Sequence, residues 1–158
     1  MDPGLSEAAA RVFAEVLGEF AFLFGDPVPA AELPALVGKG YLACLPFHGG
    51  AEGRVSFGVS EALALEIAAN TLGVELAEPE ASRRAPDAVK EVASVLGGRL
   101  AGTIGRPSHP VDLSPPELFR LEILEWERLR VDPGTQCFAV NEHPALLRVE
   151  FIPWKGTT

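Results

Sequence analysis

The stretch PDAVKEVASVLGG, residues 86–98, predicts an amphipathic helix around which the rest of the chain is organised. The helix opens with Pro86, whose missing N–H group costs no hydrogen bond in a first turn. Asp87 follows it, and the helix dipole favours a negative charge there. At about 100° per residue the helix carries one apolar arc, formed by Val89, Val92, Ala93, Leu96 and Leu100.

The side of this helix opposite the arc carries a polar stripe about 60° wide. Its members are Asp87, Glu91, Ser94 and Gly98. A carboxylate, a hydroxyl one turn later and a glycine one turn further predict an exposed face with little side-chain cover. On chemistry alone such a face is most often only solvated. Solvated surface and partner-binding site therefore both stay open at this point.

The segments before this helix predict a further two helices and a β-hairpin. Residues 5–24 repeat apolar side chains at helical spacing, and we assign the phenylalanines near the end of this segment to the core. Strands over 40–47 and 53–59 are joined by a glycine-rich turn, and Pro46 predicts a sheet edge or a break in the first strand. Ser60 is the expected N-cap of a second helix, which ends at Gly73.

The segments on either side of the central helix complete the predicted order of elements. Residues 74–85 are expected to form a polar linker, and the central helix is expected to continue to Ile104. Strands are predicted over 119–131, with a bulge near residues 123–124, and then over 136–140 and 145–152. This order predicts an α+β fold with three main helices packed on an antiparallel β-sheet. We expect residues 1–158 to form a single domain.

Composition excludes several classes of function. The net charge is −9, and no basic run exceeds two residues, so the chain lacks the footprint that nucleic acid or an anionic membrane requires. No apolar run is long enough to span a bilayer, and the N-terminus lacks signal-peptide features, so we expect a cytoplasmic protein. Cys44 and Cys137 are expected to be buried, reduced thiols.

Enzymatic motifs are equally sparse. The histidines are isolated, with no metal-ligand spacing, so we expect neither a metal site nor a cofactor. No nucleophile–base pair and no phosphate-binding glycine loop is evident.

The pattern Asp87-x-x-x-Glu91-x-x-Ser94, continuing into Gly97-Gly98, resembles the signature helix of the CheX/CheC chemotaxis phosphatase family. That signature reads Asp/Ser-x-x-x-Glu-x-x-Asn. The resemblance extends upstream to a Gly-x-Val-x-Phe strand at 53–57 and to an alanine-rich helix with an LGVE exit at 72–75. The first helix offers no second signature, because Gly18 stands where the Asn would follow Glu15. The chain is therefore closer to CheX, which has one signature helix.

The resemblance implies a role in two-component signal transduction. Family members dephosphorylate the phosphoaspartate of CheY-type response regulators, whose receiver domain carries the Mg²⁺. By this resemblance Glu91 pairs with the partner's lysine, the glycines after Ser94 let the partner approach, and Ser94 stands where the Asn orients the attacking water. The resemblance also implies a homodimer.

The serine leaves three functions open. The chain is a receiver-domain phosphatase, a non-catalytic adaptor of the same fold, or an unrelated acidic binding module. Arg99 and Asn70 are further candidates to replace the missing amide.

Overall fold

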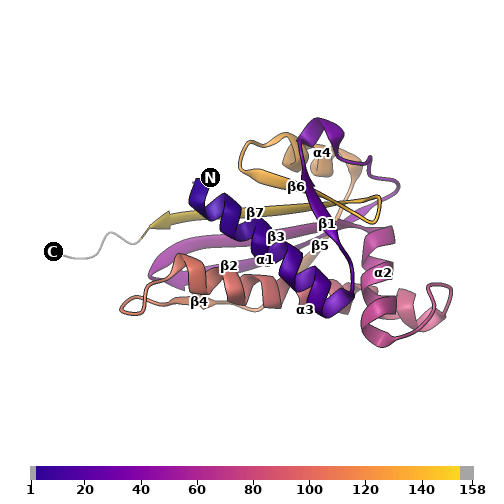
Figure 1. The fold of residues 1–158 in the computed structure, drawn as a ribbon, viewed down its shortest axis with the longest axis horizontal. Coiled ribbons are helices and arrows are strands. Elements are labelled where there is room, and N and C mark those ends of the chain that lie inside the picture. Colours follow the sequence, from indigo (N-terminus) through magenta and orange to yellow (C-terminus); the bar gives the residue numbers. More distant parts are fainter. Residues whose placement is uncertain (1–2, 154–158) are drawn as a thin grey trace.

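The computed structural model describes residues 3–153, the last two by their backbone alone (Figure 1). Its helices are α1 (Pro3–Ala21), α2 (Glu61–Leu72), α3 (Pro79–Ile104) and α4 (Ile123–Val131), with a 3₁₀ turn, η1, at Ala30–Glu32. Its strands are β1 (Gly25–Val28), β2 (Gly40–Gly49), β3 (Ala51–Ser60), β4 (Val111–Leu113), β5 (Glu117–Leu121), β6 (Thr135–Val140) and β7 (His143–Pro153).

The strands form one seven-stranded antiparallel sheet in the order β1-β6-β7-β3-β2-β4, with β5 also paired to β2. The predicted hairpin is the β2–β3 pair at its centre, in which Leu45 lies opposite Val55. The α+β fold, with helices on an antiparallel sheet, is confirmed.

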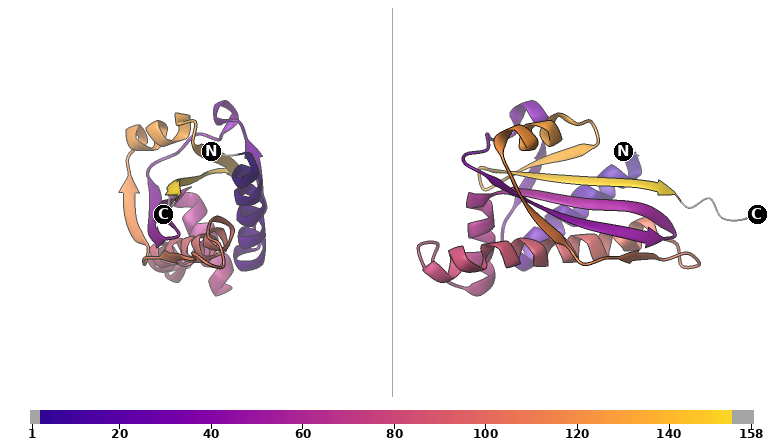
Figure 2. Two further views of the ribbon diagram at one scale, coloured as in Figure 1. Left: turned by 90° about the vertical axis from the view of Figure 1, so that its left-hand side faces the viewer. Right: turned by 180° about the vertical axis from the view of Figure 1, so that it is seen from behind.

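Helices α1, α2 and α3 cover one face of the sheet, as the end-on view of Figure 2 shows. The ring of Phe13 in α1 stacks on Phe138 of β6 at 3.8 Å and meets Phe57 of β3 edge-on at 6.0 Å. Burying such aromatic and aliphatic side chains supplies most of the free energy of folding. Helix α2 begins and ends as predicted, because Ser60 accepts the N–H of Leu63 and Gly73 closes the helix at φ 70°.

Helix α4 covers the opposite face of the sheet, where a strand with a bulge was predicted. That prediction is wrong: β5 ends at Leu121, and the side chains of Glu122 and Glu125 form a capping box that starts a helix. Trp126 is fully buried against Gly40 of β2, where a Cβ atom would lie 2.8 Å from the indole ring. The capping box therefore starts the helix locally, and the buried tryptophan holds it against the sheet.

Helix α3 begins at Pro79, so the predicted linker over 74–85 is helical in its second half and Pro86 lies inside the helix. A proline within a helix removes one hydrogen bond and costs stability. The extra turns bury Ala85 and Ala81, which extend the apolar arc one and two turns upstream of Val89. Packing on the core therefore outweighs the local stop signal.

Strand β2 is neither an edge strand nor broken at Pro46, which corrects both alternatives of the prediction. It pairs with β3 on one side and with β5 and then β4 on the other. Pro46 lies between these two partners, where the neighbouring chain is interrupted and the carbonyl of Pro46 accepts the N–H of Ser114. The missing donor is thus accommodated by a gap in the adjacent strand.

The end of α1 differs from the prediction too, because the helix stops at Ala21. Phe20, Phe22 and Phe24 were assigned to the core, yet they are 43%, 69% and 86% exposed. Phe22 adopts a left-handed conformation with φ 55°, and the chain turns there so that Leu23 is the buried residue. Cys44 and Cys137 are buried free thiols, as predicted.

Candidate functional site

Helix α3 presents the predicted polar stripe to solvent. Asp87, Glu91, Ser94 and Gly98 are all exposed. On the other side of the helix Val89, Leu96 and Leu100 have no exposed surface. The rotation of the helix is therefore the one that its apolar spacing predicts.

A groove of about 510 Å³ runs along this stripe. It brings together Asp87, Glu91 and Ser94, but Gly98 is not among its lining residues. Phe20 of α1 and Thr71 of α2 form the rest of its wall together with further residues of α3. The site is thus a shallow trough with carboxylates, an ammonium group, a hydroxyl and apolar surface, built by α3, its neighbour in sequence α2, and the distant helix α1.

The polar groups that α3 contributes to the groove are uncommitted, whereas the hydroxyl of Thr71 donates to backbone carbonyls of α2. Within residues 3–153, the side chains of Asp87, Glu91 and Ser94 make no hydrogen bond or ion pair with another part of the chain. Lys90, which also lines the groove, is equally unpaired among the described residues. These charges remain hydrated in the free protein and are available to a docked partner.

Arg99 and Asn70 are committed elsewhere. The Arg99 guanidinium donates to Glu19 at 2.5 Å and lies 3.7 Å from the carboxylate of Glu15, both on α1. The hydrogen bond to Glu19 raises the pKa of Arg99 above its usual range. The amide of Asn70 donates to the carbonyl of Ala21 at 2.7 Å. Both side chains hold α1 in place, so neither is free to substitute for an amide at Ser94.

The two glycines after Ser94 have different roles. A Cβ atom on Gly97 would lie 3.1 Å from Leu45 and 3.4 Å from Leu113, so this glycine lets α3 approach the sheet closely. A Cβ atom on Gly98 would meet nothing within 4 Å. The expectation that both glycines leave room for a partner is therefore wrong for Gly97, which faces the core.

Sequence reasoning missed several residues of the site. Phe20 was assigned to the core, since its helical spacing fits the apolar arc of α1 and nothing local indicates where α1 ends. Thr71 carried no signal, because only the packing of α2 against α3 brings it to the groove.

Among the described residues, no group of three or more His, Cys, Asp or Glu side chains is placed to share a metal ion. Within residues 3–153, no helix combines the length and apolar character needed to cross a bilayer.

Comparisons with known proteins point to one family. A family model described as chemotaxis phosphatase CheX matches residues 41–132, which include α3. No functionally curated protein matches the sequence significantly.

Solved structures share the fold at low identity. Chemotaxis protein CheX from Desulfovibrio desulfuricans aligns with a TM-score of 0.69 at 14% identity, over 94% of this chain and 99% of that one. CheX from Vibrio vulnificus gives 0.66 at 18% identity, over 94% and 96%. The CheX–CheY–BeF3–Mg²⁺ complex from Borrelia burgdorferi gives 0.65 at 14% identity, over 93% and 97%.

Proposed function

We propose that this chain, which belongs to the CheX family of chemotaxis phosphatases, binds the receiver domain of a CheY-type response regulator through α3. In this proposal, binding promotes loss of the aspartyl phosphate from the regulator. The observation that carries the proposal is the uncommitted Glu91–Ser94 pair, one helical turn apart in an exposed groove. A related structure from Borrelia burgdorferi was solved as a CheX–CheY complex. The chain needs no cofactor of its own in this scheme, and Mg²⁺ is expected on the receiver.

Glu91 is the proposed docking residue. Its carboxylate faces solvent and has no partner among residues 3–153, so it can pair with a lysine on the receiver. An exposed ion pair adds little affinity, whereas a charge pair desolvated at an interface contributes more and fixes orientation. Asp87 lies one turn earlier in the same groove, and the two carboxylates together outweigh the single ammonium group of Lys90, so a cationic partner face would meet a net negative charge.

Ser94 is the proposed water-positioning residue. Phosphoryl transfer to water requires little covalent chemistry and depends on holding the water in line with the phosphorus. A hydroxyl can donate and accept a hydrogen bond, but it is shorter than a carboxamide and has one donor proton in place of two. A misplacement of about 1 Å is expected to cost on the order of 10²-fold in rate. We therefore expect a slow phosphatase.

The same substitution supports a second candidate function, a non-catalytic adaptor that binds the receiver through Glu91 and leaves the phosphate in place. The two candidates predict the same binding and differ only in phosphate release. Arg99 and Asn70 offer no replacement amide, because both already bind α1. The choice between the candidates thus rests on Ser94 alone.

The test is phosphate release from a panel of phosphorylated CheY-type receiver domains. We compare the wild type with Ser94→Asn, Glu91→Ala and, as a matched control, Glu7→Ala, whose carboxylate is exposed on α1 outside the groove. Acceleration by the wild type and by Glu7→Ala, with loss in Glu91→Ala, supports the phosphatase. Activity in Ser94→Asn alone supports the adaptor. No binding and no release in any variant overturns both.

The proposal includes a homodimer in the cytoplasm. Among the described strands β5 pairs only with β2, so its outer edge has unpaired backbone groups, and exposed edges of this kind favour pairing with another chain. Phe119 on β5 and Leu124 on α4 add exposed apolar surface, at 46% and 71%. Light scattering should give twice the mass of the chain, and Phe119→Lys should return it to the monomer. A monomeric wild type contradicts the dimer.

A further inference from the structure

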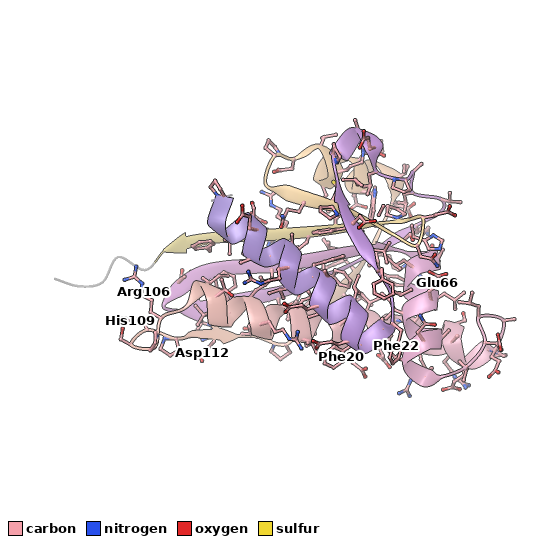
Figure 3. The ribbon with its side chains drawn as sticks, viewed as in Figure 1. Phe20, Phe22, Glu66, Arg106, His109 and Asp112 are labelled. Atoms are coloured by element: carbon pink, nitrogen blue, oxygen red, sulfur yellow. The ribbon has the colours of Figure 1, made fainter. Side chains whose placement is uncertain are left out.

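The C-terminal end of α1 carries an aromatic patch, formed by Phe20 and Phe22, that the core does not use. Phe20 is 43% exposed and Phe22 is 69% exposed. Figure 3 shows both rings at the end of α1, where it lies beside α3 and α2. Large apolar side chains gathered on a surface are characteristic of interaction sites.

Phe22 adopts a backbone conformation that is unfavourable for a residue other than glycine. Its φ of 55° lies in the left-handed region, which glycine adopts freely and a bulky residue enters only at a cost in conformational free energy. The ring is mostly exposed, so burial gives little in return. Glycine at this position would therefore relieve the backbone strain of the folded chain. Strain of this kind, where folding does not need it, points to a functional role for the side chain.

Phe20 connects the patch to the candidate site. Its side chain lines the same groove as Glu91 and Ser94. The Arg99 guanidinium lies 5.8 Å from the centre of the Phe20 ring and is fixed by its ion pairs with α1. This contact holds Phe20 at the groove before any partner arrives, which lowers the entropic cost of binding.

We propose that the Phe20–Phe22 patch is the apolar half of the receiver-binding surface, and that it selects a receiver domain with an exposed apolar side chain beside the lysine that meets Glu91. This inference rests on the proposed function and adds the chemistry of the partner surface. An apolar anchor next to a charged pair is the arrangement found at the centre of tight interfaces, where surrounding contacts exclude water from the pair.

Charge favours this occupant over the alternatives. In this groove the two carboxylates of Asp87 and Glu91 outnumber the one ammonium group of Lys90, so a second copy that docks groove to groove would set negative charge against negative charge. An anionic lipid surface meets the same repulsion. A receiver face that offers a lysine ammonium with neighbouring apolar carbon atoms matches both the carboxylates and the rings.

Binding to receiver domains loaded with beryllofluoride and Mg²⁺ tests the inference. Phe22→Gly removes the ring and relieves the backbone strain, so its melting temperature should equal or exceed that of the wild type. We expect its dissociation constant to rise roughly tenfold, as for an aromatic anchor removed from an interface. Phe20→Ala should act in the same direction. Val131→Ala, which truncates a side chain 61% exposed on α4, is the matched control and should bind normally.

The outcomes separate this inference from the proposed function. If Glu91→Ala weakens binding while Phe22→Gly binds like the wild type, the receiver site stands and the aromatic anchor is wrong. If Phe22→Gly lowers the melting temperature by several degrees, the ring is structural and the inference also fails. If the wild type binds no receiver in the panel, the proposed function fails and the inference falls with it.

Discussion

Truncating Leu96 tests the orientation of α3, on which the whole site depends. Leu96 has no exposed surface and lies in the core that α3 forms with the sheet. Leu96→Ala removes three carbon atoms, which at about 0.8 kcal/mol each corresponds to about 2.4 kcal/mol of lost transfer free energy. Incomplete collapse of the resulting cavity raises the expected destabilisation to about 3–4 kcal/mol.

Thermal unfolding followed by circular dichroism measures this loss. In a chain of 158 residues each kcal/mol lowers the melting temperature by about 2–4 °C, so Leu96→Ala should unfold roughly 6–16 °C below the wild type. Glu91→Ala is the paired control on the opposite side of the same helix. Its free energy of unfolding should stay within about 0.5 kcal/mol of the wild type, because an exposed, unpaired carboxylate contributes little to folding.

The pair of variants also separates structure from function. Glu91→Ala should lose receiver binding while keeping its stability, and Leu96→Ala should keep binding at temperatures where it remains folded. An unchanged melting temperature for Leu96→Ala would show that this side of α3 is not packed on the sheet. A large loss of stability in Glu91→Ala would show that the carboxylate is structural. Either result refutes the assignment of the exposed stripe as the site.

Three further predictions concern single positions. Gly98→Ala should stabilise the protein by about 0.5–1 kcal/mol, since alanine favours a helix interior and a Cβ atom there meets nothing within 4 Å. The same change should weaken receiver binding, and an unchanged affinity would show that Gly98 is not in the interface. The N–H of Gly134, and then the Arg148 guanidinium, hold the pKa of Asp132 below its ordinary 3.8. The stabilisation from this carboxylate is therefore complete above about pH 4 and is lost as the pH falls through the lowered pKa. Asp132→Asn should thus be less stable than the wild type at pH 7, and its free energy of unfolding should change less with pH below about pH 4. Burial raises the pKa of the Cys137 thiol, so at pH 8 it should react with a thiol reagent only after denaturant is added; rapid labelling of the native protein would contradict its burial.

Local sequence signals predicted those parts of the fold that depend on periodicity and capping. The spacing of Val89, Leu96 and Leu100 indicated which side of α3 is buried, and Ser60 and Gly73 marked the limits of α2. These signals work because a helix or strand places its side chains at fixed angles whatever it packs against. The exposed Glu91–Ser94 stripe follows from the same geometry.

Tertiary packing decided the rest. The burial of the α3 turns before Pro86, the packing of Trp126 on Gly40 and the internal position of Pro46 all depend on partners distant in sequence.

The groove itself also needs the tertiary structure, because Phe20 and Thr71 reach it only when α1 and α2 lie beside α3. By itself, the sequence determined the fold class, the sheet hairpin and the exposed face that carries the candidate residues. Only the tertiary structure decided what surrounds that face. Burial energy depends on contacts across the whole chain, whereas helical periodicity is local.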